Sequence, residues 1–241
     1  EAGGGGSGRS SGSLPPPADD PKIFGKYRLI AAIGHGGMAE VFLAVVTGPA
    51  GFNKLQVIKR LRSTLADQPD LRTMFLDEAR LAARLNHRNI VQTNEVGVAP
   101  GDQYFIAMEY LDGQPYNRIL SRGKQVKQAL PLRIALRILS DLLAGLHYAH
   151  ELADYDGAPL HIVHRDISPQ NVFVTYDGQT KIVDFGIAKT SRRMVETQSG
   201  VIKGKVAYMA PEQAFAASSE VDRRADLFSV GVMLWEALAG K

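Results

Sequence analysis

The sequence predicts an α+β protein of two lobes: a small, antiparallel, mostly β lobe with one key helix, and a larger lobe that is mainly helical. Short apolar runs joined by glycine turns fill residues 27–61, and an amphipathic helical pattern follows at residues 69–86. Long apolar helical patterns dominate after residue 131. The 241 residues are 45% hydrophobic and 22% charged, so the chain can bury a large core in one or two domains.

The first 22 residues differ from the rest in composition. They are rich in Gly, Ser and Pro and offer almost nothing to bury, so we expect a disordered linker at residues 1–22. The folded domain is expected at residues 23–241, with the small lobe at 23–110 and a partial large lobe at 111–241. No secretory signal opens the chain, and the absence of an initiator Met favours a fragment or a processed form.

Five short apolar runs bounded by turn residues predict the strands of the small lobe. The first three form a meander, and the last two bracket the turn APGD. The predicted strands are residues 27–34, 39–46, 54–61, 90–98 and 103–111. Between the third and fourth runs, residues 69–86 repeat Leu71, Phe75 and Ala79 at helical spacing and predict an amphipathic helix.

The segment MEYLDG, residues 108–113, is expected to connect the two lobes. A long amphipathic helix is predicted from Pro131, a residue suited to the first turn of a helix, to about His150. The apolar residues 225–240 predict a second, buried helix. Between these helices we expect three short strands and a long polar stretch, at residues 162–165, 171–176, 181–186 and 187–207.

Composition excludes several kinds of site. The chain has no Cys, which excludes disulfides, thiolate catalysis and Cys-built zinc sites and permits a reducing interior. We expect a cytoplasmic location. This expectation also covers the case in which the chain is the cytoplasmic portion of a longer, membrane-anchored protein. The six His lack the spacing of a zinc helix, and a net charge of +3 with dispersed basic residues disfavours nucleic-acid binding. The apolar residues 227–240 are interrupted by Ser229 and Glu236 and are too few to span a membrane.

The stretch IGHGGMAEVFLA places Gly34, Gly36 and Gly37 between two predicted strands. Without side chains, these residues let backbone amides approach phosphates closely. A glycine-rich hairpin turn is more often only a turn, and a strand instead of a helix follows it, which excludes a dinucleotide-binding βαβ unit. The loop alone is therefore weak support for nucleotide binding.

Five polar residues further along the chain point to phosphate and metal chemistry. Lys59 ends a predicted strand, and Glu78 lies in the following helix, where it can hold the ammonium group against a phosphate. Asp166 lies in a turn and can accept a hydroxyl proton, while Asn171 and Asp184 offer the oxygen ligands that Mg²⁺ prefers. Taken singly, each is better explained as a solvated, capping or turn residue.

Together, these motifs resemble those of the eukaryotic-like (Hanks-type) protein kinases. A glycine-rich loop, a strand Lys, a helix Glu, HRD with Asn171, DFG and APE follow in the order of that family. The resemblance covers Tyr27 to Lys241 and is closest to bacterial serine/threonine kinases, with HRDISPQN and KGKVAYMAPEQA similar to the myxobacterial type. It implies a protein-kinase-like fold and transfer of the γ-phosphoryl group of Mg-ATP, or Mn-ATP, to Ser or Thr of protein substrates in signalling.

The resemblance also implies a role for each site residue. Asp166 orients and deprotonates the acceptor hydroxyl, and Asn171 and Asp184 hold the metal. Met108 is the gatekeeper, and Glu109 and Leu111 present backbone groups to the adenine edge. The implied ATP-binding residues are Ile33, Gly34, Gly36, Gly37, Val41, Val57, Lys59, Glu78, Met108, Glu109, Leu111 and Phe173.

Four residues carry implied regulatory roles, namely Arg165, Phe185, Thr197 and Ser199. Arg165, next to the catalytic Asp, would anchor a phosphate group on the segment after DFG, a bidentate role that suits guanidinium. We expect Thr197 and Ser199 to be its acceptors. Thr190 and Ser191 are the next candidates. Phosphopeptide mapping of active protein tests this, and finding all four hydroxyls unmodified would count against it.

Two positions depart from the family pattern. Most serine/threonine kinases have Lys two positions after the catalytic Asp and Thr after the glycine that precedes the APE segment, whereas this chain has Ser168 and Lys205 there. We expect the two side chains to have exchanged places. Lys205 then supplies the positive charge near the γ-phosphate, and Ser168 hydrogen-bonds Asp166. The alternative is that Lys205 is solvated and Mg²⁺ alone suffices.

Alternatives to an active serine/threonine kinase stay open. A pseudokinase-like, ATP-binding scaffold or an inactive fragment keeps the fold without turnover, and Ser168 leaves room for it. A small-molecule kinase is disfavoured by APE at residues 210–212. Tyrosine as the acceptor is not excluded, and the sequence predicts no oligomeric state.

The family pattern predicts further structure around the last helix. Three more helices are expected beyond Lys241, with an arginine that pairs with Glu212. Without them we expect the large lobe to expose apolar surface. Asp226 is expected to brace the backbone of the HRD turn.

Overall fold

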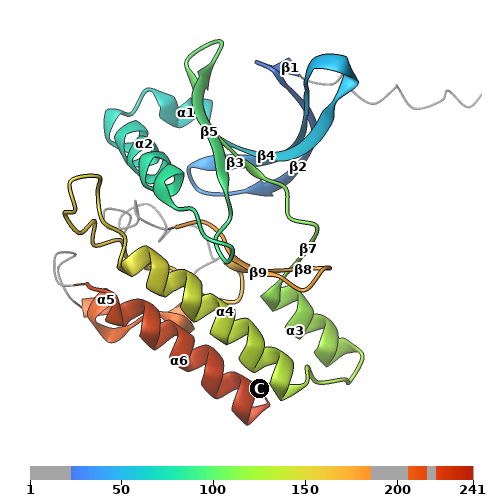
Figure 1. The fold of residues 1–241 in the computed structure, drawn as a ribbon, viewed down its shortest axis with the longest axis vertical. Coiled ribbons are helices and arrows are strands. Elements are labelled where there is room, and N and C mark those ends of the chain that lie inside the picture. The colour runs from blue at the N-terminus through green and yellow to red at the C-terminus, as the bar shows by residue number, and fades with distance from the viewer. Residues whose placement is uncertain (1–22, 186–205, 216–220, 241) are drawn as a thin grey trace, which may run out of the picture.

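The computed structural model describes residues 23–185, 206–215 and 221–240, which form two lobes, one above the other (Figure 1). The strands of the upper lobe are β1 (Ile23–Phe24), β2 (Tyr27–His35), β3 (Ala39–Thr47), β4 (Asn53–Leu61), β5 (Thr93–Ala99) and β6 (Gln103–Glu109). They form one antiparallel sheet in the order β1-β2-β3-β4-β6-β5. The predicted meander and the predicted hairpin around APGD are both confirmed.

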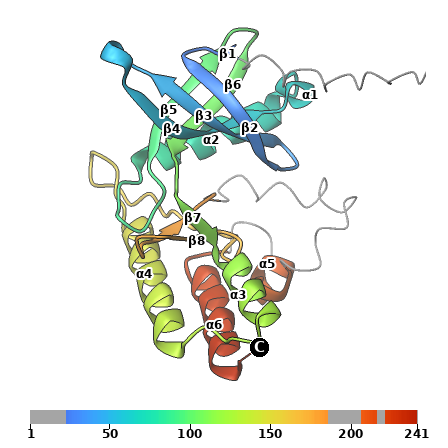
Figure 2. The ribbon, with the colours of Figure 1, turned by 90° about the vertical axis from the view of Figure 1, so that its right-hand side faces the viewer.

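Two helices and a 3₁₀ turn accompany this sheet, namely α1 (Ser63–Ala66), α2 (Pro69–Arg84) and Pro49–Gly51. α2 lies to one side of the sheet in Figure 1 and behind it in Figure 2, and it contacts β5. It buries Phe75 and Ala79 against Met38, Leu61 and Ile106 of the small lobe. The amphipathic pattern in the sequence therefore packs one face of α2 into the small-lobe core.

The lower lobe is mainly helical. Its elements are β7 (Gly113–Pro115), α3 (Tyr116–Gln125), α4 (Leu132–His150), β8 (Val172–Thr175), β9 (Thr180–Ile182), a 3₁₀ turn at Val206–Tyr208, α5 (Pro211–Phe215) and α6 (Arg224–Ala239). β7, β8 and β9 form a small sheet between the upper lobe and the paired helices α4 and α6 (Figure 2). The core of this lobe centres on Leu142, Leu146, Ile182 and Met233, all at most 2% exposed. The predicted α+β class and two-lobed arrangement are confirmed.

One predicted strand is absent, because residues 162–165 form an irregular segment. Ile162, Val163 and His164 are buried as an apolar strand would be. However, the backbone N–H groups of His164 and Arg165 donate to the carboxylate of Asp226 on α6, at 2.9 and 2.8 Å. A side chain thus satisfies buried donors that a sheet would otherwise satisfy. The predicted bracing role of Asp226 is confirmed.

Other boundaries also differ from the prediction. Pro131 precedes α4 as its N-cap, with extended backbone (φ −56°, ψ 133°), and does not occupy the first turn. β5 begins at Thr93, because Ile90 instead forms an isolated bridge with Ile182 of the lower lobe. β1 and α3 were not predicted. β1 has only two residues, and α3 is mostly polar, with Tyr116 as its one fully buried residue.

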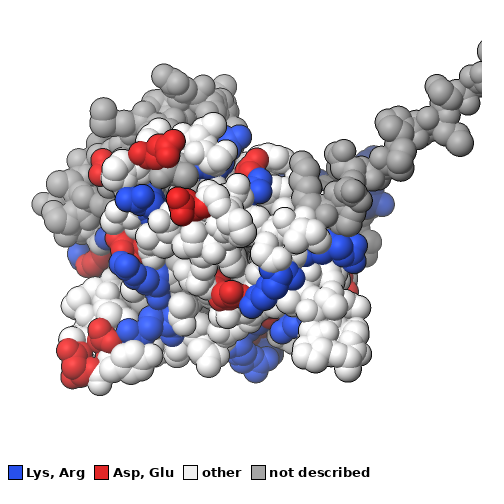
Figure 3. Space-filling model, turned by 90° about the horizontal axis from the view of Figure 1, so that it is seen from above, with Lys and Arg blue, Asp and Glu red and all other residues white. Residues whose placement is uncertain are grey.

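The large lobe exposes apolar side chains, as expected. On α4 they are Leu132, Ile134, Leu136 and Leu143, and on α6 they are Leu227, Phe228, Leu234, Trp235 and Leu238. None of the helices in the described part of the chain is long and apolar enough to cross a membrane. Seen from above, the upper lobe shows basic and acidic side chains intermixed instead of one basic stripe (Figure 3).

Candidate active site

One face of the small-lobe sheet gathers four of the predicted ATP-binding residues. Val41 on β3 pairs directly with Lys59 on β4, and Val57, two positions before Lys59, pairs with Met108 on β6. Paired residues on neighbouring strands share a face, as do residues two apart on one strand. Val41, Val57, Lys59 and Met108 therefore lie on the same face, where all four are half-buried.

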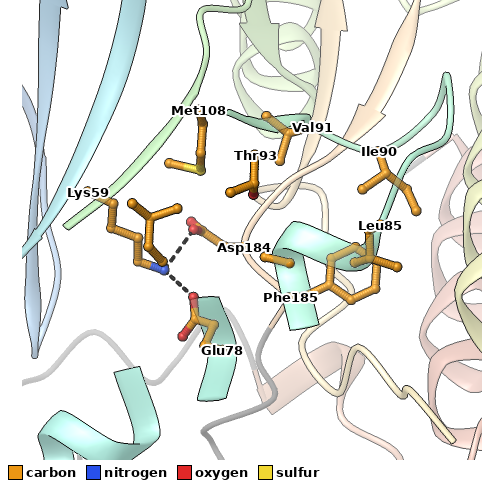
Figure 4. Close-up of a pocket in the computed structure, with 11 residues that line it drawn as sticks. Lys59, Glu78, Leu85, Ile90, Val91, Thr93, Met108, Asp184 and Phe185 are labelled. Atoms are coloured by element: carbon orange, nitrogen blue, oxygen red, sulfur yellow. Dashed lines mark hydrogen bonds and ion pairs between the residues drawn. The ribbon is translucent and has the colours of Figure 1, made fainter. Parts of the chain in front are cut away.

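Lys59 joins the two lobes electrostatically. Its Nζ lies 2.5 Å from Oε1 of Glu78 on α2 and 3.1 Å from Oδ1 of Asp184, which comes 125 residues later (Figure 4). Burial alone would lower the pKa of Lys59, but the carboxylates of Asp184 and Glu78 outweigh it and raise that pKa above its ordinary value. Lys59 is therefore a permanent positive charge between the lobes.

A small, mostly apolar pocket lies beside this ion pair. Met108, Ile106 and Phe185 line it together with Lys59 and Glu78 (Figure 4). Its free volume of about 20 Å³ has room for a single water molecule and none for an adenine ring. The pocket beside Met108 therefore has no room for a nucleotide base.

The glycine-rich turn between β2 and β3 is open to solvent. Its closing hydrogen bond runs from the N–H of Gly36 to the carbonyl of Ala39, at 2.8 Å. Gly36 and Gly37 are exposed, and Gly34 pairs with Val41 in the sheet. None of these three glycines has a left-handed backbone. The glycines are thus not required by an unusual φ angle. Their missing side chains instead leave the backbone amides of the turn accessible.

Asn171 fixes the position of Asp166. Its Nδ2 donates to both the backbone carbonyl and the carboxylate Oδ2 of Asp166, each at 2.7 Å. The N–H of Val183 donates to the carbonyl of Asn171 at 3.0 Å, which places the segment of Asp184 next to this turn. Asp166 and Asn171, the two predicted catalytic residues of this turn, are therefore in contact. Asp184, the predicted metal ligand, directly follows Val183, which is hydrogen-bonded to Asn171.

Asn171 and Asp184 have the oxygen atoms that the predicted divalent-cation site needs. Because Nδ2 of Asn171 is bound to Asp166, its Oδ1 is left without a hydrogen-bond donor among the described residues. The carboxylate side chain of Asp184 is 50% exposed. Mg²⁺ is usually held by one or two carboxylates together with substrate phosphates. In the described ranges no group of three or more His, Asp or Glu forms a metal site by itself, so this pair would need the phosphates.

The HRD motif contacts both the DFG motif and Gln213, the residue that follows APE. The ring of His164, which is fully buried, lies 4.6 Å from the ring of Phe185. Arg165 has a left-handed backbone with φ of 64°, and its carbonyl accepts a hydrogen bond from Gln213 on α5 at 2.9 Å. The backbone around Asp166 is therefore held from both the DFG and the APE side.

Ser168 does not make the predicted hydrogen bond to Asp166. Its side chain is only 3% exposed, and its Oγ has no hydrogen-bond partner within residues 23–185, 206–215 and 221–240. Asn171 instead donates to the Asp166 carboxylate. An unbonded buried hydroxyl costs folding free energy, on the order of 1–3 kcal/mol.

Glu109 has a role that the sequence analysis missed. Its Oε1 accepts from Nζ of Lys181 at 2.6 Å and from the N–H of Gln92 at 2.8 Å. Its own N–H donates to the carbonyl of Gln92 at 3.0 Å. The connection between the lobes is thereby tied to β9, the strand that leads into Asp184. No sequence pattern marks a Glu and a Lys that lie 72 positions apart.

The other predicted residues are placed as follows. Ile33 on β2 is 53% exposed, and Leu111 is half-buried in the connection between β6 and β7. Phe173 is half-buried on β8, where it pairs with Pro115 and Lys181. Thr197, Ser199 and Lys205 lie outside the described residues.

Comparisons with known proteins agree with this geometry. The family model of the protein kinase domain matches residues 27–241. The chain is similar to the tyrosine-protein kinase MasK of Myxococcus xanthus, with 52% identity over 89% of this chain and 33% of MasK. It is also similar to the serine/threonine-protein kinase PknA of Mycobacterium tuberculosis, with 35% identity over 91% of this chain and 48% of PknA.

A solved structure also matches. The crystal structure of the Mycobacterium tuberculosis PknI kinase domain aligns with a TM-score of 0.65 and 28% identity, over 92% of this chain and 78% of that chain. The two-lobed fold is thus shared with a solved kinase domain. The chain spans only about a third of the length of MasK and about half of PknA.

Proposed function

Since the chain belongs to the protein kinase domain family, we propose that it is the catalytic part of a bacterial serine/threonine protein kinase that uses Mg-ATP. One observation carries the proposal: Lys59 contacts Glu78 and Asp184 at the same time. Protein kinases transfer phosphate only when the Lys–Glu ion pair and the metal-binding Asp are both in place. This arrangement favours an enzyme over an ATP-binding scaffold.

The residues of the site divide the chemistry among themselves. Bound Mg-ATP supplies the γ-phosphoryl group and the positive charge of the metal. Lys59 contributes a permanent charge for the α- and β-phosphates, and the oxygens of Asn171 and Asp184 would hold Mg²⁺ or Mn²⁺. Asp166, oriented by Asn171, accepts the proton of the attacking hydroxyl.

The adenine site lies on the open side of the gatekeeper. Val41 and Val57 from the sheet face and Phe173 from β8 would sandwich the ring. The N–H of Glu109 already donates to Gln92, so Glu109 can offer adenine only its carbonyl. Leu111 would supply the backbone donor next to it.

We propose Ser and Thr as the acceptors, although the similar MasK is named a tyrosine kinase. PknA, which is also similar, is named a serine/threonine kinase, and the APE segment offers a platform for protein substrates. The test incubates the chain with γ-labelled ATP, Mg²⁺ and a generic basic protein, and then identifies the labelled amino acid after hydrolysis. We expect phosphoserine and phosphothreonine, and no label when EDTA removes the metal. Phosphotyrosine alone would overturn the acceptor assignment.

We also propose that Lys205 compensates for Ser168 by bringing a positive charge to the γ-phosphate. The support is local: a lysine is absent at Ser168, whose buried hydroxyl has no partner in the described part of the chain. The test is a double-mutant cycle of Ser168→Lys and Lys205→Thr. We expect Lys205→Thr alone to lower kcat at least about tenfold, and Ser168→Lys to restore most of this loss. Purely additive effects on turnover would sink the exchange.

A further inference from the structure

α2, the helix that carries Glu78, is shared between the two cores of the molecule. In its middle, Phe75 and Ala79 pack into the small lobe, and Glu78 pairs with Lys59. Leu85, directly after the last turn, is 1% exposed and belongs to the core of the large lobe. The position of Glu78 therefore depends on how the C-terminal end of α2 is seated on the large lobe.

That end of α2 rests near a short hairpin, residues 151–160, which connects α4 to the turn containing Asp166 (Figure 1). The hairpin is held by its own backbone. Ala153 bridges Pro159, and the N–H of Asp154 donates to the carbonyl of Ala158 at 2.7 Å. These bonds give the hairpin a defined shape, and its Leu152 and Leu160 pack against the core of the large lobe.

Arg84, in the last turn of α2, binds this hairpin on two sides. Its Nη2 donates to Oδ1 of Asp154 at 2.8 Å, and its guanidinium lies 4.1 Å from the centre of the Tyr155 ring. The same Asp154 oxygen accepts the N–H of Tyr155 at 2.7 Å, so the carboxylate is oriented before Arg84 reaches it. A hydrogen bond combined with stacking fixes a planar guanidinium in a way that a lysine could not match.

The same stretch of chain supports the catalytic turn. Beyond the hairpin, the N–H groups of His164 and Arg165 are held by Asp226, directly before Asp166. The hairpin thus links the end of α2 to the turn that carries the proposed base. Movement of α2 relative to this segment would change the distance between Glu78 and the rest of the site.

We propose that Arg84 and Asp154 are positioning residues, which hold α2 so that Glu78 stays in hydrogen-bonding distance of Lys59. Glu78 lies six positions before Arg84, or about 9 Å along the helix axis. A helix transmits a displacement of its end over this length with little loss. A shift of about 1 Å would take the 2.5 Å contact between Lys59 and Glu78 out of good hydrogen-bond geometry. The effect on turnover rests on the proposed kinase function, whereas the effect on α2 does not.

The test compares Asp154→Asn and Arg84→Gln with Asp156→Asn in the full chain. Asp156 is a matched control, because it is exposed on the same hairpin and, within the described residues, its carboxylate accepts only the N–H of Ala158, at 3.0 Å. The readouts are kcat, KM for ATP and hydrogen–deuterium exchange of α2. For Asp154→Asn and Arg84→Gln we expect kcat to fall about three- to tenfold, with faster exchange in α2. For Asp156→Asn we expect the behaviour of the unmodified chain.

A charge reversal separates positioning from simple damage to the fold. The pair Arg84→Asp and Asp154→Arg restores an ion pair in the opposite sense, so we expect it to recover at least half of the lost turnover and the slow exchange of α2. The proposal is overturned if Asp154→Asn exchanges in α2 as slowly as Asp156→Asn, whatever its turnover. Should the unmodified chain transfer no phosphate, the exchange rates still decide. Faster exchange in Asp154→Asn alone would then support the positioning role, and the proposed function would be the part that failed.

Discussion

Asp184→Asn is expected to lower phosphoryl transfer by on the order of a thousandfold. The carboxylate of Asp184 would hold the divalent cation together with Oδ1 of Asn171, and a neutral amide is a much poorer ligand for Mg²⁺. A bound cation stabilises the transition state by several kcal/mol, and each factor of ten in rate corresponds to about 1.4 kcal/mol. Loss of the cation therefore affects turnover far more than loss of a single hydrogen bond.

The same substitution should leave the fold intact. Asp184 has a left-handed backbone, with φ of 55°, which Asn tolerates as well as Asp does. Lys59 also keeps its contact with Glu78. Asp177→Asn is the control, because Asp177 is an exposed carboxylate in the turn between β8 and β9. Turnover and Mn²⁺ titration are measured on both variants, and similar values for the two would contradict the metal role of Asp184.

Asp226→Ala is expected to destabilise the fold by about 3–5 kcal/mol. Asp226 is fully buried, and its carboxylate accepts the N–H groups of His164 and Arg165. Its Oδ2 also lies 2.8 Å from Nε2 of His150 on α4. Alanine would leave these buried groups without a partner, at a cost of about 1–3 kcal/mol for each unsatisfied group. This loss is a large fraction of the 5–15 kcal/mol that stabilises a typical domain.

Denaturant unfolding measures this effect, with Asp222→Ala as the control. Asp222 lies just before α6, but its carboxylate is exposed and, among the described residues, hydrogen-bonds only the neighbouring Arg224. We expect the free energy of unfolding, and with it the midpoint, to fall strongly for Asp226→Ala. For Asp222→Ala we expect the free energy of unfolding to change by less than about 0.5 kcal/mol. Equal midpoints for the two variants would show that Asp226 does not anchor the segment before Asp166.

Local patterns in the sequence predicted most of the fold. Short apolar runs between turn residues located the long strands, and helical spacing located α2 and α4. A long apolar run located α6. α3 was missed because YNRILSRGKQ is mostly polar and its apolar stripe has only three residues, Tyr116, Ile119 and Leu120. Residues 162–165 misled the prediction for the opposite reason. They are buried like a strand, but the N–H groups of His164 and Arg165 are satisfied by the carboxylate of Asp226. Asp226 lies 61 positions after Arg165, so no local pattern shows this.

The residues of the site were predicted from the order of the motifs, but most of the contacts between them could not be predicted. The resemblance to kinases supplied the pairing of Lys59 with Glu78, but no spacing rule predicted the contact between Lys59 and Asp184 across 125 positions. Contacts specific to this chain had no such guide. The bond between Glu109 and Lys181 and that between Arg84 and Asp154 each join residues at least 70 positions apart. The expected bond from Ser168 to Asp166 was wrong, because Asn171 donates to that carboxylate instead.

The central claim is that Lys59, Asp166 and Asp184 form a working phosphotransfer site and not an ATP-binding scaffold. The most direct measurement follows ATP binding and transfer of γ-label to protein in the same samples, for the unmodified chain and for Asp166→Asn. We expect both proteins to bind ATP with affinities within about threefold, because Asp166 acts on the acceptor hydroxyl. Transfer should occur in the unmodified chain and fall by at least about a hundredfold in the variant. If both proteins bind ATP and neither transfers label, the chain is a scaffold and the account is contradicted.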